Sequence, residues 1–383
     1  MSGLPPLALY VHLPWCVRKC PYCDFNSHQL KSAVPDAGYL DSLLSDFDLE
    51  APLVRGRTIE SVFFGGGTPS LFPPESFEFL LSALKSRIGW RPDAEVTLEA
   101  NPGTIERGRF AGYRQAGINR VSLGAQSFSA PALERLGRIH TPADTLRAAA
   151  ELRAAGIVNF NLDLMYALPD QTIDQARADI AAACELEPAH LSHYQLTLEP
   201  GTAFHARPPS LPDEDTAWEM QLECQRLLAC AGYAQYEVSA YARGGARCRH
   251  NLNYWLFGDY LGIGAGAHGK ITLDAPDQIL RTAKPKQPRE YRNAIAAAAE
   301  PIGEREFTER RLLVFEFKLN ALRLNEGFSV DDFEQRTGLS IDALTEPFAA
   351  ARERGMLEST AAGWRASEFG RRFLNDLQAG FLA

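Results

Sequence analysis

The 383-residue sequence has no apolar run long enough to cross a bilayer, so it predicts no membrane-spanning helix. Its first residues lack the basic and apolar regions of a secretory signal peptide. A formal net charge of -9 argues against a broad nucleic-acid-binding surface, which needs a basic patch. The 7 cysteines are odd in number and three are clustered, which suits a reducing compartment rather than a disulfide framework. We therefore expect a cytoplasmic protein that binds no nucleic acid.

Two nucleotide-binding motifs are also missing. No G-x-G-x-x-G segment opens a helix, and the glycines at 65–67 are not followed by the G-K-[ST] of a Walker loop. The chain does contain a regular alternation of strand-like and helix-like segments, which favours a parallel sheet with right-handed crossovers. The six predicted strands are Ala8–His12, Ser61–Phe64, Glu95–Glu99, Arg120–Leu123, Val158–Leu164 and His190–Leu196.

Polar and glycine residues follow almost every predicted strand, on the side of the sheet where barrel enzymes build their sites. This placement favours an α/β fold with a partial (β/α)6 TIM-type barrel over a doubly wound sheet. The pattern changes near Glu304, where a helix at Phe307–Leu324 precedes further helices and a β-hairpin. We predict a core barrel at 1–240, a connecting segment at 241–303, and a small winged-helix-like α+β domain at 304–383.

Three cysteines, Cys16, Cys20 and Cys23, follow the first predicted strand with the spacing C-x3-C-x2-C. Three thiolates on one short loop can hold three corners of a cubane [4Fe–4S] cluster. The fourth iron then has no protein ligand and is open to a small molecule. A structural zinc site is the alternative, with His28 or Asp24 as a fourth ligand, but such sites usually come as two C-x-x-C pairs. The spacing therefore favours the cluster.

A second set of chemical groups follows predicted strands two to five. The loop Gly65-Gly66-Gly67-Thr68-Pro69 permits a ligand to approach the main chain closely. Polar side chains on the same rim suit a zwitterionic nucleoside, because a carboxylate pairs with an ammonium group and an arginine with a carboxylate. Aspartate or glutamine can in addition bind ribose hydroxyls. These side chains are Glu99, Gln126, Arg138 and Asp163.

The whole chain resembles the radical S-adenosylmethionine (SAM) superfamily, in the branch that contains the oxygen-independent coproporphyrinogen III oxidases. The resemblance lies, in order and spacing, in the cysteine loop, the Gly-Gly-Gly-Thr-Pro loop and residues 98–103, 124–128 and 162–172. It implies that the three cysteines bind a [4Fe–4S] cluster, which in active members cleaves SAM to a radical. It also implies a SAM pocket formed by Tyr10, Tyr22, Gly66, Gly67, Thr68, Glu99, Gln126, Arg138 and Asp163.

Two departures from the oxidases resemble a related family, the heme chaperones of the HemW type. Phe25 occupies the position of the oxidases' fourth cysteine, and residues 249–255 contain the pattern H-N-x-x-Y-W. This resemblance implies delivery of heme to respiratory-chain proteins and a heme site formed by His250, Asn251, Tyr254 and Trp255. The ligand of the heme iron would be His250, since imidazole is a standard axial ligand. Judged without the resemblance, that histidine reads as a hydrogen-bonded core residue, and His268 is a second candidate ligand.

Three classes of function stay open at this point. The first is a heme chaperone, which Phe25 and the H-N-x-x-Y-W pattern favour. The second is a radical SAM enzyme, such as a coproporphyrinogen III oxidase, and the third is a zinc-stabilised binding module. The C-terminal domain lacks the basic face of a DNA-binding winged helix, so we expect a docking or lid domain that contacts a client protein. Peripheral contact with a membrane also stays open.

Overall fold

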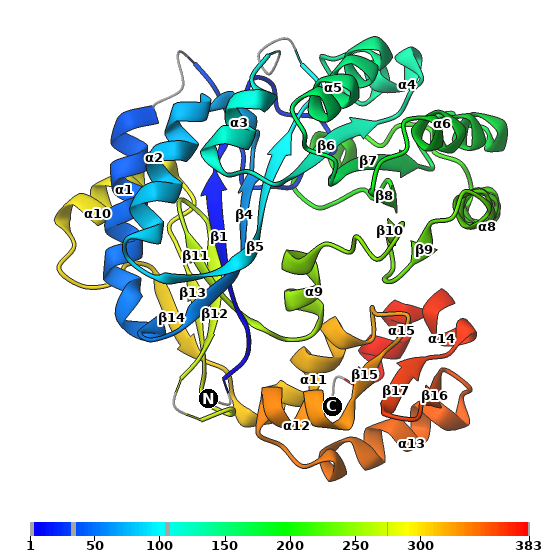
Figure 1. Cartoon of the computed structure of the whole chain (residues 1–383). Coiled ribbons are helices and arrows are strands. Elements are labelled where there is room, and N and C mark those ends of the chain that lie inside the picture. The colour runs from blue at the N-terminus through cyan, green and yellow to red at the C-terminus, as the bar shows by residue number, and fades with distance from the viewer. Residues whose placement is uncertain (1–3, 32–35, 104–107, 274, 382–383) are drawn as a thin grey trace.

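Strand pairing organises most of the chain in the computed structural model, which describes residues 4–31, 36–103, 108–273 and 275–381. Within these residues, twelve strands form one sheet in the order β14-β13-β12-β11-β1-β4-β5-β6-β7-β8-β10-β9. Figure 1 shows this sheet curving through the molecule, while the C-terminal elements form a lobe beside helix α9 (Arg249–Trp255). Helix α9 therefore lies where the two parts of the chain meet.

Six consecutive strands of the sheet run parallel to one another and confirm the predicted partial (β/α)6 barrel. They are β1 (Leu7–Leu13), β4 (Thr58–Gly66), β5 (Gly89–Ala100), β6 (Arg120–Gln126), β7 (Phe160–Tyr166) and β8 (His190–Gln195). Helices cover the outer side of the curved sheet (Figure 1). These are α1 (Asp36–Glu50), α2 (Pro74–Lys85), α3 (Phe110–Ala116), α4 (Ala130–Arg135), α5 (Pro142–Ala154), α6 (Ile173–Glu185) and α8 (Glu214–Cys230). The short helix α7 (Ala203–Ala206) instead contacts the cysteine loop, where the Phe204 N–H donates to the Pro21 carbonyl oxygen at 3.0 Å.

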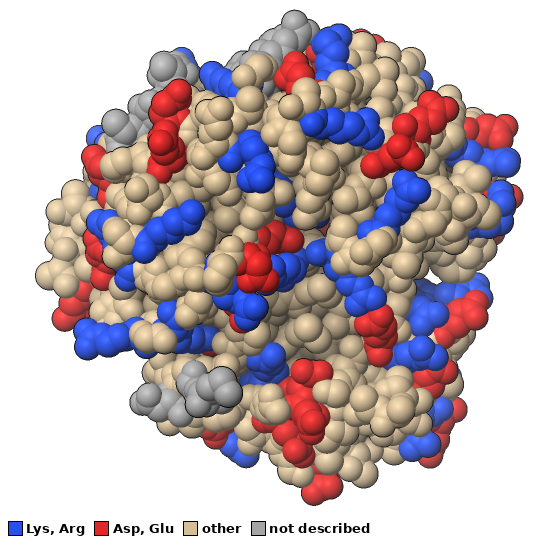
Figure 2. All heavy atoms as spheres, in the orientation of Figure 1, with Lys and Arg blue, Asp and Glu red and all other residues tan. Residues whose placement is uncertain are grey.

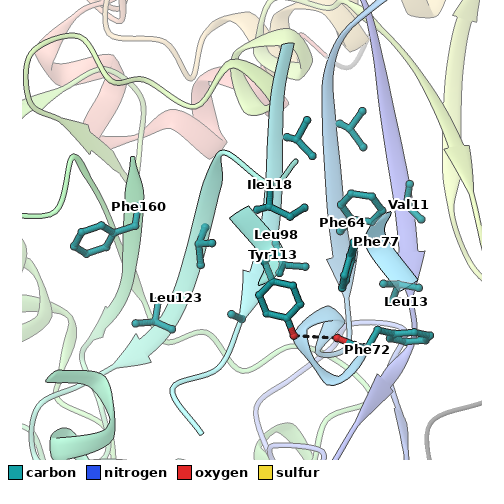
Figure 3. Packing of buried hydrophobic residues seen from close by; sticks show 14 of the residues in the cluster. Val11, Leu13, Phe64, Phe72, Phe77, Leu98, Tyr113, Ile118, Leu123 and Phe160 are labelled. Carbon is teal, nitrogen blue, oxygen red and sulfur yellow. Dashed lines mark hydrogen bonds between the residues drawn. The ribbon is translucent and has the colours of Figure 1, made fainter. Parts of the chain in front are cut away.

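The main apolar core fills the space between these strands and the helices outside them. Figure 3 shows side chains of β4 and β5 facing Phe77 of α2 and Tyr113 of α3. The rings of Phe64 and Phe77 meet edge to face at 5.0 Å, and those of Phe77 and Tyr113 at 5.4 Å. Each such pair contributes about 0.5–1.5 kcal/mol beyond the burial of its area. The Tyr113 hydroxyl donates to the main-chain oxygen of Phe72 at 2.9 Å, which pins α3 to the loop after β4 (Figure 3).

Local sequence fixes where several of the helices begin and end. Helix α5 starts with a capping box between Thr141 and Asp144, and α6 with one between Thr172 and Gln175. Each box satisfies main-chain N–H groups that a helix otherwise leaves without partners. Helix α3 ends at Gly117, whose φ of 111° is readily adopted only by glycine. These signals hold the connections short, so the strand ends remain close to one another.

The segment 241–303 extends the barrel sheet instead of running beside it. After α9, strand β11 pairs parallel with β1, and antiparallel strands follow it to the edge of the sheet. These edge elements are β11 (Asp259–Ile263), β12 (His268–Thr272), β13 (Ile279–Ala283), α10 (Pro288–Ala297) and β14 (Glu304–Phe307). On the opposite edge lie β9 (Ala234–Gln235) and β10 (Ala240–Ala242). The predicted helix at Phe307–Leu324 starts later, at Arg310, because the main chain of β14 pairs with β13.

The last part of the chain forms the predicted small α+β domain. Its elements are α11 (Arg310–Ala321), β15 (Phe328–Ser329), α12 (Val330–Thr337), α13 (Thr345–Glu353), β16 (Leu357–Ser359), β17 (Gly363–Ala366), α14 (Glu368–Arg372) and α15 (Leu374–Ala379). A second apolar cluster, centred on Phe317, Phe333 and Phe348, fills its interior. Phe257, in the loop after α9, joins that cluster and stacks edge to face with Phe317 at 5.7 Å. The barrel sheet and the small domain therefore pack against each other through this loop.

Within the described residues, no helix has both the length and the apolar character needed to cross a membrane. Figure 2 shows Lys and Arg interspersed with Asp and Glu over the visible face, with no continuous patch of one sign. The visible face therefore has no broad basic surface, and the formal net charge of the chain is -9.

Candidate functional site

The cysteine loop lies between two short strands at the carboxyl end of β1. Strands β2 (Trp15–Cys16) and β3 (His28–Gln29) pair in parallel and close the loop at its base. The Cys23 N–H donates to the Cys20 carbonyl oxygen at 3.2 Å, which tightens the turn between these two residues. Cys16, Cys20 and Cys23 are half-buried and carry free thiols. All three line one cavity of about 460 Å³, at the mouth of the barrel.

The donor set in this cavity fits a cluster with three cysteine ligands. Burial raises the pKa of the Cys16 and Cys23 thiols, and the Thr68 hydroxyl donates to Cys16 Sγ at 3.5 Å. The Arg138 guanidinium donates to Cys20 Sγ at 3.8 Å. Such donors stabilise the thiolate form that binds iron. Among the described residues, no three Cys, His, Asp or Glu side chains converge on one point as a single metal ion requires.

A polar chain connects the two cysteine contacts and includes a residue that sequence reasoning missed. Asn101, in the turn after β5, donates to Thr68 Oγ1 at 2.9 Å and accepts from the Arg138 guanidinium. Arg138 also donates to the Gly124 carbonyl oxygen at 2.8 Å. The position of Asn101 directly after a strand, before Pro102 and Gly103, was the available signal. This chain holds Thr68 and Arg138 against the cysteine loop.

Two carboxylates from β5 and β7, on either side of β6 in the sheet, line the same cavity. Glu99 is the last residue but one of β5, and Asp163 lies in β7. Burial and the nearby charge of Asp163 raise the pKa of Glu99 to about 8. Burial also raises the pKa of Asp163, while Asn161 and Ser122 donate hydrogen bonds that oppose this effect. A cation bound near these two carboxyl groups would favour their ionised forms.

Gln126 enters this cavity from a strained position at the end of β6. Its φ is 64°, in the left-handed region that non-glycine residues rarely adopt, and the β6–β7 register shifts just before it. The Tyr194 hydroxyl of β8 donates to Gln126 Oε1 at 2.8 Å. Strain of this kind is usually found where a side chain must point into a site. Tyr194 was not predicted, because nothing in its own sequence neighbourhood connects it to β6.

The glycine loop after β4 passes very close to other main-chain atoms. A Cβ on Gly67 would lie 2.5 Å from the Trp15 carbonyl oxygen, and one on Gly66 would lie 2.8 Å from the His12 ring. The Gly67 N–H donates to the Leu13 carbonyl oxygen at 2.9 Å, and the Gly66 N–H donates to Glu99 Oε2 at 3.2 Å. Glycine is therefore required by packing between the loop and β1. Its N–H groups are also partly committed to protein acceptors.

The predicted site residues divide between two adjoining cavities. The 460 Å³ cavity is lined by the three cysteines and by Tyr22, Gly67, Thr68, Glu99, Gln126, Arg138 and Asp163. A larger cavity of about 720 Å³ is lined by Tyr10, Gly66, Glu99, Tyr254 and Trp255 among others. Asp24, Phe25, Ser27 and Glu99 line both and form the wall between them. His250 and Asn251 line neither cavity.

His250 is 1% exposed and both of its ring nitrogens are hydrogen-bonded. Nδ1 lies 3.1 Å from Ser61 Oγ, and Nε2 lies 3.0 Å from the Tyr254 hydroxyl. The ring also stacks on Phe63 with centroids 5.0 Å apart. Burial, together with the charge of Arg120, lowers the pKa of His250 to about 3. The imidazole is therefore neutral, and binding a metal at Nε2 requires exchange of the Tyr254 bond.

Helix α9, which carries the H-N-x-x-Y-W pattern, is held at its start by a residue that sequence reasoning missed. Glu95 of β5 is 5% exposed and accepts the N–H groups of Arg249 and His250, each at 3.2 Å. A carboxylate at a helix N-terminus satisfies N–H groups that the helix leaves unpaired and complements its dipole. Trp255, at the other end of the helix, packs under the Arg323 guanidinium at 4.3 Å. Its buried indole N–H has no hydrogen-bond partner among the described residues.

Known proteins are similar to this chain over its full length. Residues 10–183 match the model of the Radical SAM superfamily, and residues 310–373 match that of the HemN C-terminal domain. The chain is 48% identical to the heme chaperone HemW of Escherichia coli over 384 residues, covering 100% of both chains. It is 47% identical to the heme chaperone HemW of Haemophilus influenzae, covering 100% of this chain and 99% of that one.

The solved structure of the Escherichia coli coproporphyrinogen III oxidase HemN, a radical SAM enzyme, has the same fold. It superposes with a TM-score of 0.83 over 99% of this chain and 91% of that chain, at 22% identity. Identity this low supports the fold and leaves the activity open. The full-length identity to the two HemW proteins is about twice as high. The chain therefore belongs to the heme chaperone HemW family, within the radical SAM superfamily.

Proposed function

We propose that this chain is a heme chaperone that acts in the cytoplasm, binds heme, a [4Fe–4S] cluster and SAM, and delivers heme to respiratory-chain proteins. The observation that carries the proposal is the 48% identity to a heme chaperone HemW over the full length of both chains. It is supported by the cavity that brings Tyr254 and Trp255 next to the cysteine loop. The clients would be respiratory proteins that need heme, and their docking surface would be the C-terminal domain.

The cluster would be held by Cys16, Cys20 and Cys23, with SAM beside it. When bound, such a cluster supplies an open iron that chelates the amino and carboxylate groups of SAM. The remaining groups of the cavity would act on the nucleoside. Glu99 and Asp163 offer negative charge to its cationic parts, and Gln126 offers an amide to its ribose hydroxyls. Tyr22 and Gly67 shape the cavity around it, while Tyr10 and Gly66 face the neighbouring one.

Heme would occupy the larger cavity, against Tyr254 and Trp255, with His250 as ligand of the iron. The cavity volume of about 720 Å³ falls in the range of about 300–1,000 Å³ that is common for ligand pockets. The unpartnered indole N–H of Trp255 is a donor that the protein itself leaves unsatisfied. His250 reaches the iron only after Tyr254 moves, so its coordination would follow entry of the heme. Asn251, half-buried beside it, would support the helix in that change.

Heme titration of the purified protein, followed by absorbance, tests this function. We expect the wild-type chain to bind heme with a Soret band typical of histidine coordination. The variant His250→Ala should bind more weakly and with a shifted band. His205→Ala, an exposed histidine of α7, is the matched control and should behave as wild type. A wild-type chain that binds no heme would remove the proposal.

The alternative of a radical enzyme has its own test. Phe25, at the position of the oxidases' fourth cysteine, is 59% exposed and lies in the wall between the cavities. A bulky apolar ring there replaces a thiol with a group that cannot donate or accept a hydrogen atom readily. We expect the reduced, reconstituted protein to leave coproporphyrinogen III unchanged in the presence of SAM. Formation of protoporphyrinogen IX would make the chain an oxidase.

A further inference from the structure

The 720 Å³ cavity has a second group of lining residues, next to the aromatic ones, that the proposed function does not use. The first group comes from α9 and β11, where the rings of Tyr254 and Tyr260 meet edge to face at 4.4 Å. The second comes from β12, β13 and the residues after them, and it contributes His268, Arg281 and Lys286. Aromatic rings beside basic and nitrogen-bearing side chains provide the contacts that a metal-bound porphyrin with acidic side chains would need.

Three histidines line this cavity, and they differ in whether their nitrogens are free. His12 Nε2 donates to the Asn26 carbonyl oxygen at 2.8 Å, and its Nδ1 accepts from the Tyr10 hydroxyl at 3.0 Å. His28 Nε2 donates to the Lys286 carbonyl oxygen at 3.3 Å. His268, the first residue of β12, is exposed to the cavity and forms no side-chain hydrogen bond within the described residues. It is therefore the histidine in this cavity with both ring nitrogens available.

The surroundings of His268 keep its imidazole in the form that binds metals. Partial burial and the positive charges of Lys286 and Arg281 lower its pKa below the ordinary value of 6.5. A neutral ring has a lone pair to donate at neutral pH. The next residue, Gly269, has no side chain. Main-chain atoms and the Thr282 side chain occupy the space beside it. His268 thus lies at the start of β12 and lines the cavity.

Cationic side chains line the same cavity as His268. Lys286 is exposed and forms no ion pair among the described residues, and its main-chain oxygen accepts from Asn26 of the cysteine loop at 3.0 Å. Lys19 of that loop is also exposed, and its Nζ donates only to main-chain oxygens, at 3.1 and 3.5 Å. Arg281 is already paired with Glu316. Two lysines without acidic partners are therefore available to carboxylates entering this cavity.

We propose that His268 is an axial ligand of heme bound in this cavity, and that Lys286 and Lys19 receive its propionates. This inference rests on the proposed function and names the protein groups that first meet the heme. His250 lies behind Tyr254, outside the cavity wall, whereas His268 needs no rearrangement to reach an occupant. Heme would thus be coordinated on entry by His268, before any exchange at His250.

Titration with ferric heme distinguishes the two histidines. We expect His268→Ala to weaken heme binding by at least about tenfold, which is about 1.4 kcal/mol, and to shift the Soret band and the electron paramagnetic resonance signal of the iron. Added imidazole should restore the wild-type spectrum in this variant, because it fills the vacated position. His205→Ala is the control, and His268→Gln serves as a second variant should the alanine variant fold poorly.

The propionate contacts have a separate readout. Lys286→Glu should weaken binding of heme but not of heme dimethyl ester, whose propionates carry no charge. Identical affinity and spectra for the wild type and His268→Ala, with heme bound by both, would overturn this inference and leave the proposed function standing. Absence of heme binding by the wild-type chain would instead remove both.

Discussion

Glu95 and Glu99 lie four residues apart on β5, one accepting the first N–H groups of α9 and the other lining both cavities. Residues separated by four positions on a strand point to the same face of the sheet. One strand therefore connects the helix of the H-N-x-x-Y-W pattern to the cavity beside the cysteines. Sequence reasoning included Glu99 in the site and left Glu95 out.

Replacing Glu95 tests the anchoring of helix α9. The variant Glu95→Gln removes a buried charge that accepts two N–H groups and lies near the fully buried Arg120. Hydrogen bonds to charged groups contribute about 1.5–3 kcal/mol each, so we expect a loss of about that size in the free energy of unfolding. Hydrogen exchange should become faster at the amides of 249–255. The exposed Glu78→Gln should change stability by less than about 0.5 kcal/mol, and equal losses in both variants would contradict the anchoring role.

The pH dependence of SAM binding should follow the carboxyl group of Glu99. Its pKa is raised to about 8, so it is largely protonated at neutral pH before a ligand binds. A cationic ligand favours the ionised form, hence affinity should rise with pH up to about 8, by at most about tenfold per unit, and level off above it. Glu99→Gln should flatten this dependence. Equilibrium dialysis of SAM between pH 6 and 9 measures it, and a flat wild-type profile would count against the role of Glu99.

Asn101→Ala should loosen the nucleoside cavity without removing a predicted ligand. The change removes the amide that bonds to both Thr68 and Arg138, so the two side chains keep only their contacts with Cys16, Cys20 and Gly124. We expect SAM affinity to fall by about 1–3 kcal/mol. The iron and sulfide content after reconstitution should stay close to wild type, because the three thiols are unchanged. Asn119→Ala, which removes an amide that bonds β5 outside the cavity, is the control for a general loss of stability.

Tyr254→Phe should strengthen heme coordination by His250. The hydroxyl of Tyr254 occupies Nε2 at 3.0 Å, so its removal frees the nitrogen while the ring stays in the cavity wall. A typical hydrogen bond is worth about 0.5–1.5 kcal/mol, which predicts an affinity about two- to twelvefold higher. Heme titration compares this variant with the double variant Tyr254→Phe, His250→Ala. The same gain in both would mean that His250 does not bind the iron.

The barrel and most of the site residues were predictable because their positions depend on local signals. Each strand ends in glycine or polar residues, and parallel strands bring those ends to one side, so Glu99, Gln126, Arg138 and Asp163 line one cavity. The strands β11 to β14 were not among the predicted strands. The segment around β11 is rich in glycine, which in isolation is typical of turns.

The residues alone predicted His250 as a hydrogen-bonded core histidine, but most of its partners could not have been identified from its neighbours in the sequence. Its Nδ1 partner, Ser61, lies 189 residues away, and the Glu95 acceptor at its N–H lies 155 residues away. Only the folded sheet brings β4, β5 and α9 together. Sequence could not predict the free ring of His268 either, because that depends on the absence of hydrogen-bond partners in the folded chain.

The wall shared by the two cavities has a thermodynamic consequence. Both cavities are lined by Asp24, Phe25, Ser27 and Glu99, so a ligand bound in one cavity alters the surroundings of a ligand bound in the other. Any such effect is reciprocal. If a ligand in one cavity changes the dissociation constant of a ligand in the other cavity by some factor, the second ligand changes the dissociation constant of the first by the same factor. Coupling carried by these four residues would make loading and unloading interdependent without any domain movement.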